Sequence, residues 1–297
     1  MKRNKLYILI IGIVTIIASC SEEKLNPVSQ IKDPSIAQND FDKWLYKNYT
    51  VPYNIQFNYR FVDSEADMNY NLEPAETDKA VRMANMVKHL VLEAYDEMTG
   101  SSAFMRSYYP KVVQLVGSPA YNNNGTAILA TAEGGHKIIL MNINSMSLGQ
   151  LTDADFAHYN YVYFHTLHHE FAHILHQTKP YSRAFNQISG ADYVQDSWMT
   201  VYTSDAAAQK AGFISAYASS AVDEDFVETY SLYLVTTSDS WNALIAAAGA
   251  NGQIIMQKLA IVKDYMLTSW GINMDTMRSI VLRRQQDLFS MNLDSLN

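Results

Sequence analysis

Histidine is crowded into one short stretch of this 297-residue chain, because five of its eight histidines fall within the segment HTLHHEFAHILH. Inside that segment, His169, Glu170 and His173 form the pattern H-E-x-x-H. On a helix, residues four apart lie on the same face about one turn apart, so the imidazoles of His169 and His173 can meet one zinc ion. Glu170 lies about 100° round the helix, beside the ion, where its carboxylate can take a proton from a zinc-bound water.

A catalytic zinc site needs a third protein ligand and an open fourth position. His176 comes seven residues after His169, too far along a straight helix to share the ion comfortably. We therefore interpret His176 and His165 as neighbours that support the site or pack beside it, and His168 as a further neighbour. The histidine cluster does not supply its own third ligand.

The better candidate lies about fifty residues downstream, in the segment DEDFVETY. Glu224 falls in the first turn of a predicted helix, where the helix dipole favours an ionised carboxylate. Glu228 follows one turn later on the same face, placed to accept the other ring N–H of a ligating histidine. Asp225 points about 100° away. Glu224 is the predicted ligand, and the choice against Asp225 and Glu228 needs an experiment.

The elements that must position these residues can be read from periodicity and capping signals. The sequence predicts a short helix and an extended segment from Phe41, a helix at 73–98, and a hairpin of strands 126–131 and 137–143. A long helix is predicted at 151–178, starting at Thr152 with Asp155 and stopping before Pro180. Further helices are predicted at 223–237, capped by Asp223 or Ser220, and at two places between about 251 and 290. A small mixed sheet followed by a mostly helical half is an α+β domain. Residues Ile139–Asn142 are predicted to form a sheet edge that pairs with extended substrate.

The N-terminus predicts export rather than fold. A basic start, twelve apolar residues and IASC resemble a bacterial lipoprotein signal over residues 1–20, with Cys20 as the lipidated residue. Residues 21–40 are polar and contain two prolines, as expected for a tether, and residues 41–297 form a single domain. Cys20 is the only cysteine, so no intramolecular disulfide or cysteine zinc site can form.

Charge argues against a nucleic-acid partner. The formal net charge is −8, and it becomes −11 when the three basic residues of the signal are removed. An acidic protein has no electrostatic footprint for phosphate backbones. It also lacks the basic residues that bind membrane surfaces, so membrane association is expected through a lipid at Cys20.

An H-E-x-x-H followed some fifty residues later by a helical Glu-x-x-x-Glu resembles the gluzincin arrangement of zinc peptidases. DEDFVETY is similar to a segment of the zinc aminopeptidases, and SAYASSAVDEDFVE is similar to the catalytic domain of anthrax lethal factor. Together with the lipobox and HHEFAHILHQ, these segments resemble the substrate import-associated zinc metallohydrolase lipoproteins of Bacteroidetes. The resemblance covers most of the mature chain and is sharpest at residues 165–178 and 212–234.

This resemblance implies a zincin-like fold, one zinc ion per chain, ligands His169, His173 and Glu224, and Glu170 as general base. It also implies that Tyr217 donates its phenol to the developing oxyanion. The expected function is hydrolysis of peptide bonds at the cell surface, on the outer membrane, beside a TonB-dependent transporter and its surface lipoprotein. Two alternatives stay open: a binding lipoprotein of an uptake system with a structural or vestigial zinc site, and a hydrolase of non-peptide amides or esters. An intact Glu170 favours hydrolysis.

Overall fold

The computed structural model describes residues 38–62, 69–121, 125, 127–128, 130–133 and 136–296. The predicted signal, its Cys20 and most of the tether lie outside these residues. Residues Asp40–Asn297 form one compact unit, to which the following description refers. Within the described residues, no helix is both long and apolar enough to cross a lipid bilayer.

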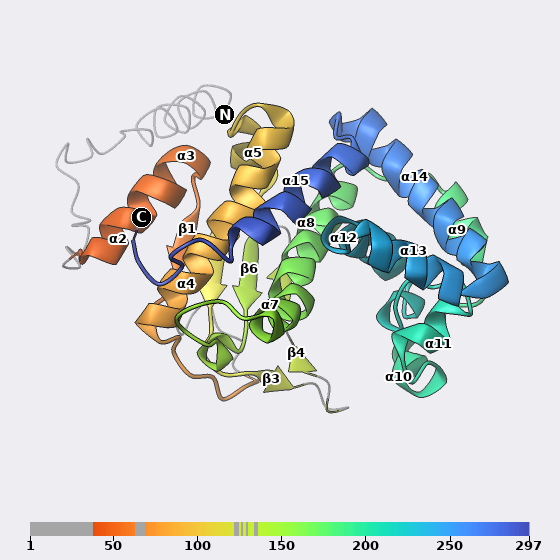
Figure 1. The fold of residues 1–297 in the computed structure, drawn as a ribbon, viewed down its shortest axis with the longest axis horizontal. Helices are drawn as coiled ribbons and strands as arrows, with labels where there is room; N and C mark the ends of the chain where they lie inside the picture. The colour runs from red at the N-terminus through yellow and green to blue at the C-terminus, as the bar shows by residue number, and fades with distance from the viewer. Residues whose placement is uncertain are drawn as a thin grey trace, which may run out of the picture. The chain divides into compact units, whose positions relative to one another are not determined.

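The N-terminal half of the unit combines helices with a four-stranded sheet (Figure 1). Its helical elements are α2 (Asp40–Leu45), η1 (Tyr46–Thr50), α3 (Val51–Tyr53), α4 (Thr77–Val87), η3 (Lys88–Leu92), α5 (Glu93–Thr99), α6 (Ala103–Tyr108) and η4 (Ile143–Ser145). Its strands are β1 (Gln56–Asn58), β2 (Val112–Leu115), β3 (Ala120–Tyr121), β4 (Ala127–Ile128), β5 (Ala130–Glu133) and β6 (Lys137–Leu140). The helix predicted at 73–98 is confirmed as the continuous run α4–η3–α5, whose middle turn is π-helical.

The main sheet has the strand order β1-β2-β6-β5. β2 pairs in parallel with β1 and β6, with Val113 opposite Phe57 and Ile138. β5 runs antiparallel to β6, so the predicted hairpin is present between 130 and 140. The prediction that Ile139–Asn142 form the substrate-binding edge is wrong, because β6 pairs on both sides and Asn142 adopts a left-handed conformation that ends the strand. Among the described strands, β5 is the edge on this side.

The C-terminal half is helical. It contains α7 (Asp153–Tyr159), η5 (Asn160–Phe164), α8 (His165–Thr178), α9 (Ala184–Ser189), η6 (Gln195–Ser197), α10 (Trp198–Val201), α11 (Asp205–Gln209), η7 (Tyr217–Ser219), α12 (Val222–Val235), α13 (Ser238–Ala247), η8 (Gly249–Asn251), α14 (Gly252–Trp270) and α15 (Met274–Asp287). The predicted α+β class with a small mixed sheet is confirmed. The sequence prediction missed α13.

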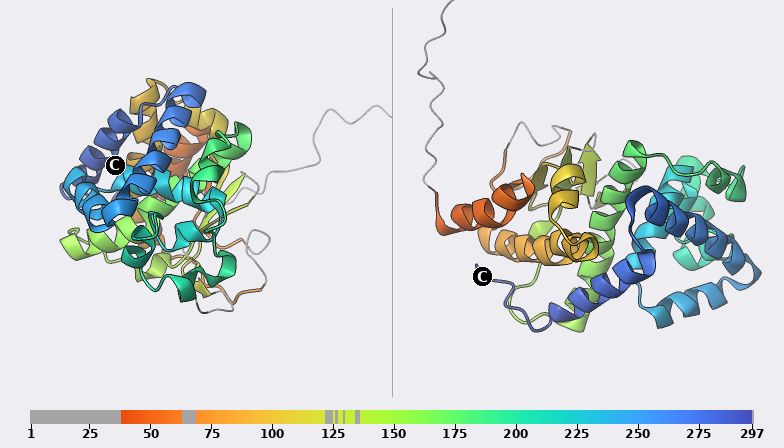
Figure 2. Two further views of the ribbon diagram at one scale, coloured as in Figure 1. Left: turned by 90° about the vertical axis from the view of Figure 1, so that its right-hand side faces the viewer. Right: turned by 90° about the horizontal axis from the view of Figure 1, so that it is seen from above.

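The long helix predicted at 151–178 is confirmed as α7, η5 and α8. The Thr152 hydroxyl accepts a hydrogen bond from the backbone N–H of Asp155, and the Asp155 carboxylate accepts one from the backbone N–H of Thr152, which is the predicted capping box. The helix stops at Thr178, before Pro180. Figures 1 and 2 show α8 in the middle of the unit, between the sheet with α4 and α5 and the C-terminal helices α12 to α14.

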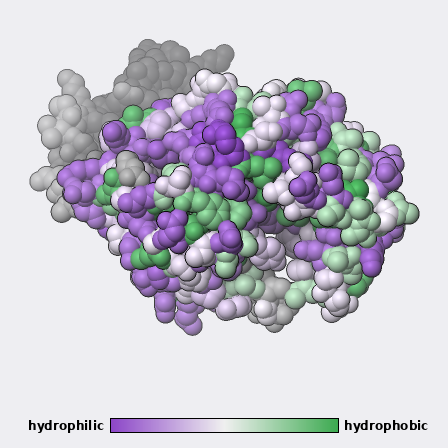
Figure 3. Space-filling view, in the orientation of Figure 1, coloured by the Kyte–Doolittle hydropathy of each residue, from purple (hydrophilic) through white to green (hydrophobic). Residues whose placement is uncertain are grey.

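Polar and apolar residues are mixed on the face in Figure 3, with the most hydrophilic region over α5 and α15. There Arg283 and Arg284 of α15 form ion pairs with Glu97 of α5, and Arg284 also pairs with Glu93. These pairs join two helices far apart in sequence. The five-histidine segment lies elsewhere, on α8, whose apolar residues Leu167, Phe171 and Leu175 are buried in the core.

Candidate metal centre

The helix α8 presents His165, His169 and His173 at four-residue intervals along one face. Successive imidazole rings lie 5.8 and 4.9 Å apart, measured between ring centroids. The opposite face fixes the rotation of the helix, because Phe171 is fully buried with its ring 5.1 Å from that of Tyr95. Hydrophobic anchoring on one side therefore holds the histidine face towards α12.

Helix α12 packs along α8 and brings Glu224 to the tips of two imidazoles. Glu224 Oε2 lies 3.2 Å from Nε2 of His169 and 3.4 Å from Nε2 of His173. Ligand atoms bound tetrahedrally at about 2.0–2.1 Å from a zinc ion lie roughly 3.3 Å apart. The measured spacings therefore match two edges of such a tetrahedron. The three atoms form a group able to hold a metal ion.

A second feature of Glu224 supports this fit. Its Oε2 atom is shielded from solvent and has no hydrogen-bond partner among the described residues. An unpaired buried carboxylate oxygen is costly unless a cation or a donor satisfies it. Two imidazole nitrogens and one carboxylate oxygen are also the donor types that zinc prefers. The residues present therefore fit a zinc ion.

The protonation of the centre reflects its mixed charges. The neighbouring imidazoles of His169 and His173 lower the pKa of Glu224 to about 2, although burial alone would raise it. Burial opposes the charged form of His169 as well, but the carboxylates of Glu224 and Glu228 raise its pKa to about 10. Without an ion, this imidazole therefore holds an extra proton. Zinc would have to displace that proton, which couples binding to pH.

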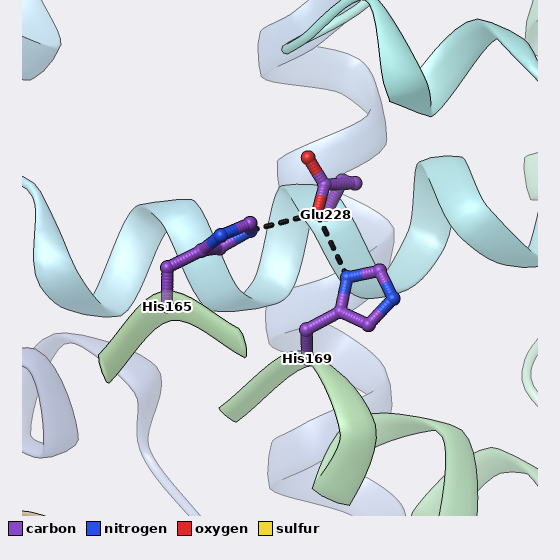
Figure 4. Close-up of side chains that lie close together, drawn as sticks. All are labelled: His165, His169 and Glu228. Atoms are coloured by element: carbon purple, nitrogen blue, oxygen red, sulfur yellow. Dashed lines mark hydrogen bonds and ion pairs between the residues drawn. The ribbon is translucent and has the colours of Figure 1, made fainter. Parts of the chain in front are cut away.

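Glu228 lies one turn further along α12 and contacts the histidines from another side (Figure 4). Its Oε1 accepts hydrogen bonds from His169 Nδ1 at 2.8 Å and His165 Nε2 at 2.7 Å. Its Oε2 accepts one from the Ser215 hydroxyl at 2.5 Å. The imidazoles hold the pKa of this fully buried carboxyl well below its usual range, against the effect of burial.

A second group that could hold an ion consists of His165, His169 and Glu228. Its oxygen–nitrogen spacings of 2.7 and 2.8 Å are ordinary hydrogen-bond lengths, shorter than the roughly 3.3 Å edge of a zinc tetrahedron. With its two oxygens already accepting three hydrogen bonds, Glu228 has the geometry of a support for His169. The structure thus places Glu224 and Glu228 in the positions predicted for a ligand and for the acceptor behind it.

Glu170 follows His169 on α8, and its carboxyl interacts electrostatically with His169, His173 and Glu224. Burial raises the pKa of its carboxyl, the imidazoles of His169 and His173 lower it, and the charge of Glu224 raises it again. A carboxyl whose pKa is raised towards neutrality is a better proton acceptor for catalysis near pH 7 than an ordinary glutamate.

Tyr217 lies on η7, with its ring 6.0 Å from that of His169 and 39% of its surface exposed. Burial and the carboxylates of Glu224, Glu228 and Glu170 raise the pKa of its phenol well above the usual value. The phenol therefore stays protonated and can donate a hydrogen bond. The structure brings Tyr217 beside the predicted centre.

The remaining histidines divide between two surroundings. His176 Nε2 lies 3.1 Å from Nδ1 of His173, so it contacts a predicted ligand from behind. Burial lowers the pKa of His176. His168 faces the opposite way and is fully buried, with its Nδ1 3.2 Å from the hydroxyl of Tyr95. Burial lowers the pKa of His168 to about 3, so this ring is neutral.

The start of α12 differs from the prediction. The helix begins after Ala221 and has no side-chain cap, so capping by Asp223 or Ser220 is wrong. Asp223 instead accepts a hydrogen bond from the Tyr181 hydroxyl. Asp225 does point away from the centre, and it forms a fully buried ion pair with Lys258 at 2.6 Å.

Sequence reasoning missed Ser215, which holds Glu228 and also accepts a hydrogen bond from the N–H of Ala218. No local pattern marks this serine, since its partner is thirteen residues away in sequence. The sequence predicted only that His165 supports the site or packs beside it, and not that it forms a hydrogen bond with Glu228.

Comparison with known proteins identifies the family. A family model described as "Putative zinc-binding metallo-peptidase" matches residues 34–275, which include every residue of the candidate metal centre. The chain belongs to this family. A similar crystal structure, of a "putative zinc-binding metallo-peptidase" from Bacteroides caccae ATCC 43185, is 39% identical, covers 86% of this chain and 95% of that chain, and has a TM-score of 0.73. Among curated proteins, none matches the chain. The resemblance drawn from sequence to zinc metallopeptidases is therefore confirmed at the level of this family.

Proposed function

We propose that this member of the metallo-peptidase family is a zinc-dependent hydrolase of peptide bonds. His169, His173 and Glu224 hold one zinc ion per chain, and Glu170 is the general base. The observation that carries the proposal is the buried Oε2 of Glu224, which accepts no hydrogen bond from a described residue and lies 3.2 and 3.4 Å from the Nε2 atoms of His169 and His173. The gluzincin type of this ligand set is part of the proposal.

A zinc ion at such a site is a Lewis acid that lowers the pKa of water to about 7 and polarises a carbonyl group. Glu170 accepts the proton of the attacking water and then transfers it to the leaving amide nitrogen. Tyr217 donates its phenolic hydrogen bond to the carbonyl oxygen as negative charge develops there. Glu228 keeps the imidazole of His169 oriented through the 2.8 Å hydrogen bond to Nδ1.

The test combines zinc analysis with cleavage of a peptide library by wild type and Glu170→Gln. We expect one equivalent of zinc in both proteins, and cleavage by wild type only, reduced at least about a hundredfold in the variant. Glu73→Gln, at an exposed glutamate outside the centre, is the matched control and should retain activity. Stoichiometric zinc without cleavage by wild type would favour the alternative of a binding protein with a structural zinc site. Cleavage of non-peptide amides or esters alone would reassign the substrate.

The surroundings of the enzyme form a further part of the proposal. The N-terminal sequence supports export as an outer-membrane lipoprotein anchored through Cys20, facing the cell surface and acting beside a TonB-dependent transporter and its lipoprotein. Incorporation of a labelled fatty acid in wild type but not in Cys20→Ala tests the anchor. Cleavage of the protein by protease added to intact cells tests the surface location.

A further inference from the structure

A hollow of about 260 Å³ is lined by residues of η5, α10, α11 and the segment before η7. Its walls include Tyr161, Trp198, Met199, Tyr202, Asp205 and Ala216. The hollow is smaller than the roughly 300–1,000 Å³ of sites that enclose a whole small molecule. It has room for one long side chain.

A chain of aromatic rings joins the hollow to the metal centre. The ring of Trp198 lies 5.4 Å from that of Tyr217, and the ring of Tyr217 lies 6.0 Å from that of His169. These contacts place Trp198 within about 12 Å of His169. A long side chain together with one peptide unit spans roughly 10 Å. A substrate residue adjacent to, or one removed from, the scissile bond can therefore reach the hollow.

Part of the lining is apolar surface left open to solvent, beside the polar residues Thr203, Ser204 and Asp205. Tyr161 is 66% exposed and Met199 is 38% exposed, although both are large apolar side chains. Exposed apolar surface that is gathered at a hollow, and not scattered singly, marks an interaction site. The aliphatic part of a side chain would bury this surface.

Asp205 makes the hollow negatively charged. It is the only charged residue of the lining, and no described Lys, Arg or His nitrogen forms an ion pair with it. Its Oδ1 accepts a hydrogen bond from the backbone N–H of Ala216 at 2.8 Å, which fixes the direction of the carboxylate. Residues 184–209 contain three aspartates and neither lysine nor arginine.

The charge also reaches the aromatic wall. Burial raises the pKa of the Tyr161 phenol, and the carboxylates of Asp205 and Glu228 raise it further. A positive group in the hollow would interact favourably with Asp205 and with the faces of Trp198 and Tyr202. An acidic side chain would be repelled, and an uncharged apolar one would desolvate Asp205 without compensation.

We propose that this hollow is a specificity subsite for a lysine or arginine side chain of the substrate, close to the bond that is cleaved. The alkyl stem lies along Trp198 and Met199, and the cationic end meets Asp205. The proposal rests on the proposed peptidase function, and it narrows the substrate class to peptides with a basic residue near the scissile bond.

The test measures binding and cleavage separately. Zinc-loaded Glu170→Gln is titrated with peptides that differ only in lysine or norleucine at each position around the cleaved bond. We expect about tenfold tighter binding of lysine at one position, falling to near equality when Asp205→Asn is added. The asparagine keeps the acceptor for the N–H of Ala216 and removes only the charge. Asp264→Asn, at an exposed aspartate of α14 outside the hollow, is the matched control and should keep the preference.

Trp198→Ala should weaken lysine and norleucine peptides alike, because both stems lose the same wall. Equal or tighter binding of norleucine to the parent protein, or a lysine preference that survives Asp205→Asn, would overturn the subsite. If the wild-type enzyme cleaves peptides but shows no preference for a basic residue near the cleaved bond, the subsite is refuted and the peptidase function stands. A lysine preference in binding, with no cleavage of any peptide by wild type, would refute the peptidase function alone.

Discussion

The division of labour between the two glutamates of α12 can be tested by replacing each with glutamine. Glu224→Gln removes the charge from the group at 3.2 and 3.4 Å from the Nε2 atoms of His169 and His173. Glu228→Gln removes the charge behind His169 and keeps an oxygen that can accept from Nδ1. Its new amide N–H group can donate to the hydroxyl of Ser215, so the hydrogen-bonded shape survives.

The two changes should differ in size. Zinc sites with four protein ligands bind with apparent free energies of about 10–16 kcal/mol, or roughly 2.5–4 kcal/mol per ligand. Loss of Glu224 as a ligand should therefore weaken zinc affinity by about 10²–10³-fold. Changes behind a ligating histidine typically cost 10–100-fold. Glu228→Gln should lie near the lower limit, at about tenfold, because its hydrogen bonds persist.

The assay is competition for zinc with a coloured chelator at fixed pH, after circular dichroism has shown that each apoprotein is folded. The order of affinities should be wild type, then Glu228→Gln, then Glu224→Gln, with at least about tenfold between the two variants. If Glu228→Gln loses as much zinc affinity as Glu224→Gln, or more, the tetrahedral-edge argument is wrong. Glu228 would then be the ligand.

Three further outcomes follow from contacts away from the ligand atoms. The His89, Lys88 and Arg284 side chains lower the pKa of Glu93 to about 2 despite burial. The ionised Glu93 therefore stabilises the folded protein fully above its ordinary pKa of 4.5, and this stabilisation is lost as the pH falls towards 2. Acid-unfolding curves should therefore flatten in Glu93→Gln and not in a matched change at exposed Glu73. Phe171→Ala should lower the free energy of unfolding by about 3–5 kcal/mol in urea titrations, since the ring is fully buried; a loss below about 1 kcal/mol would contradict its role in holding α8. Lys258→Met should cost about 3–5 kcal/mol by leaving the buried Asp225 carboxyl without its cation, and adding Asp225→Leu should recover most of that loss.

Local signals in the sequence predicted the elements that carry the centre. The spacing of His169 and His173 needs only a helix to bring them together, and the capping box with a following proline marked where that helix starts and stops. The acidic first turn of α12 marked Glu224 as a candidate ligand, although Asp223 and Asp225 lie in the same turn. These predictions depend on contacts within one helix or on chemistry that accepts few residue types, so one sequence suffices for them.

Contacts between distant segments could not be predicted in this way. The order β1-β2-β6-β5 places β6 inside the sheet, although an apolar run such as KIIL is equally compatible with an edge. In the sequence, Asp225 is one of several acidic residues at the start of a helix. Only the folded structure shows that Lys258 of α14 pairs with it. The π-helical turn η5 also has no sequence signature, yet it sets the register at which α8 begins.

The two predicted histidine ligands have different neighbours at Nδ1. With a zinc ion bound, the carboxylate of Glu228 would hold the proton on Nδ1 of His169 and leave the lone pair of Nε2 free for the ion. Behind His173 stands His176, whose pKa is lowered by burial, so its neutral Nε2 can accept a proton shared from Nδ1 of His173. Both ligands then offer Nε2. Because a carboxylate makes an imidazole more basic than a neutral acceptor does, His169 should be the stronger donor of the pair, and the two histidines should not be interchangeable in zinc affinity.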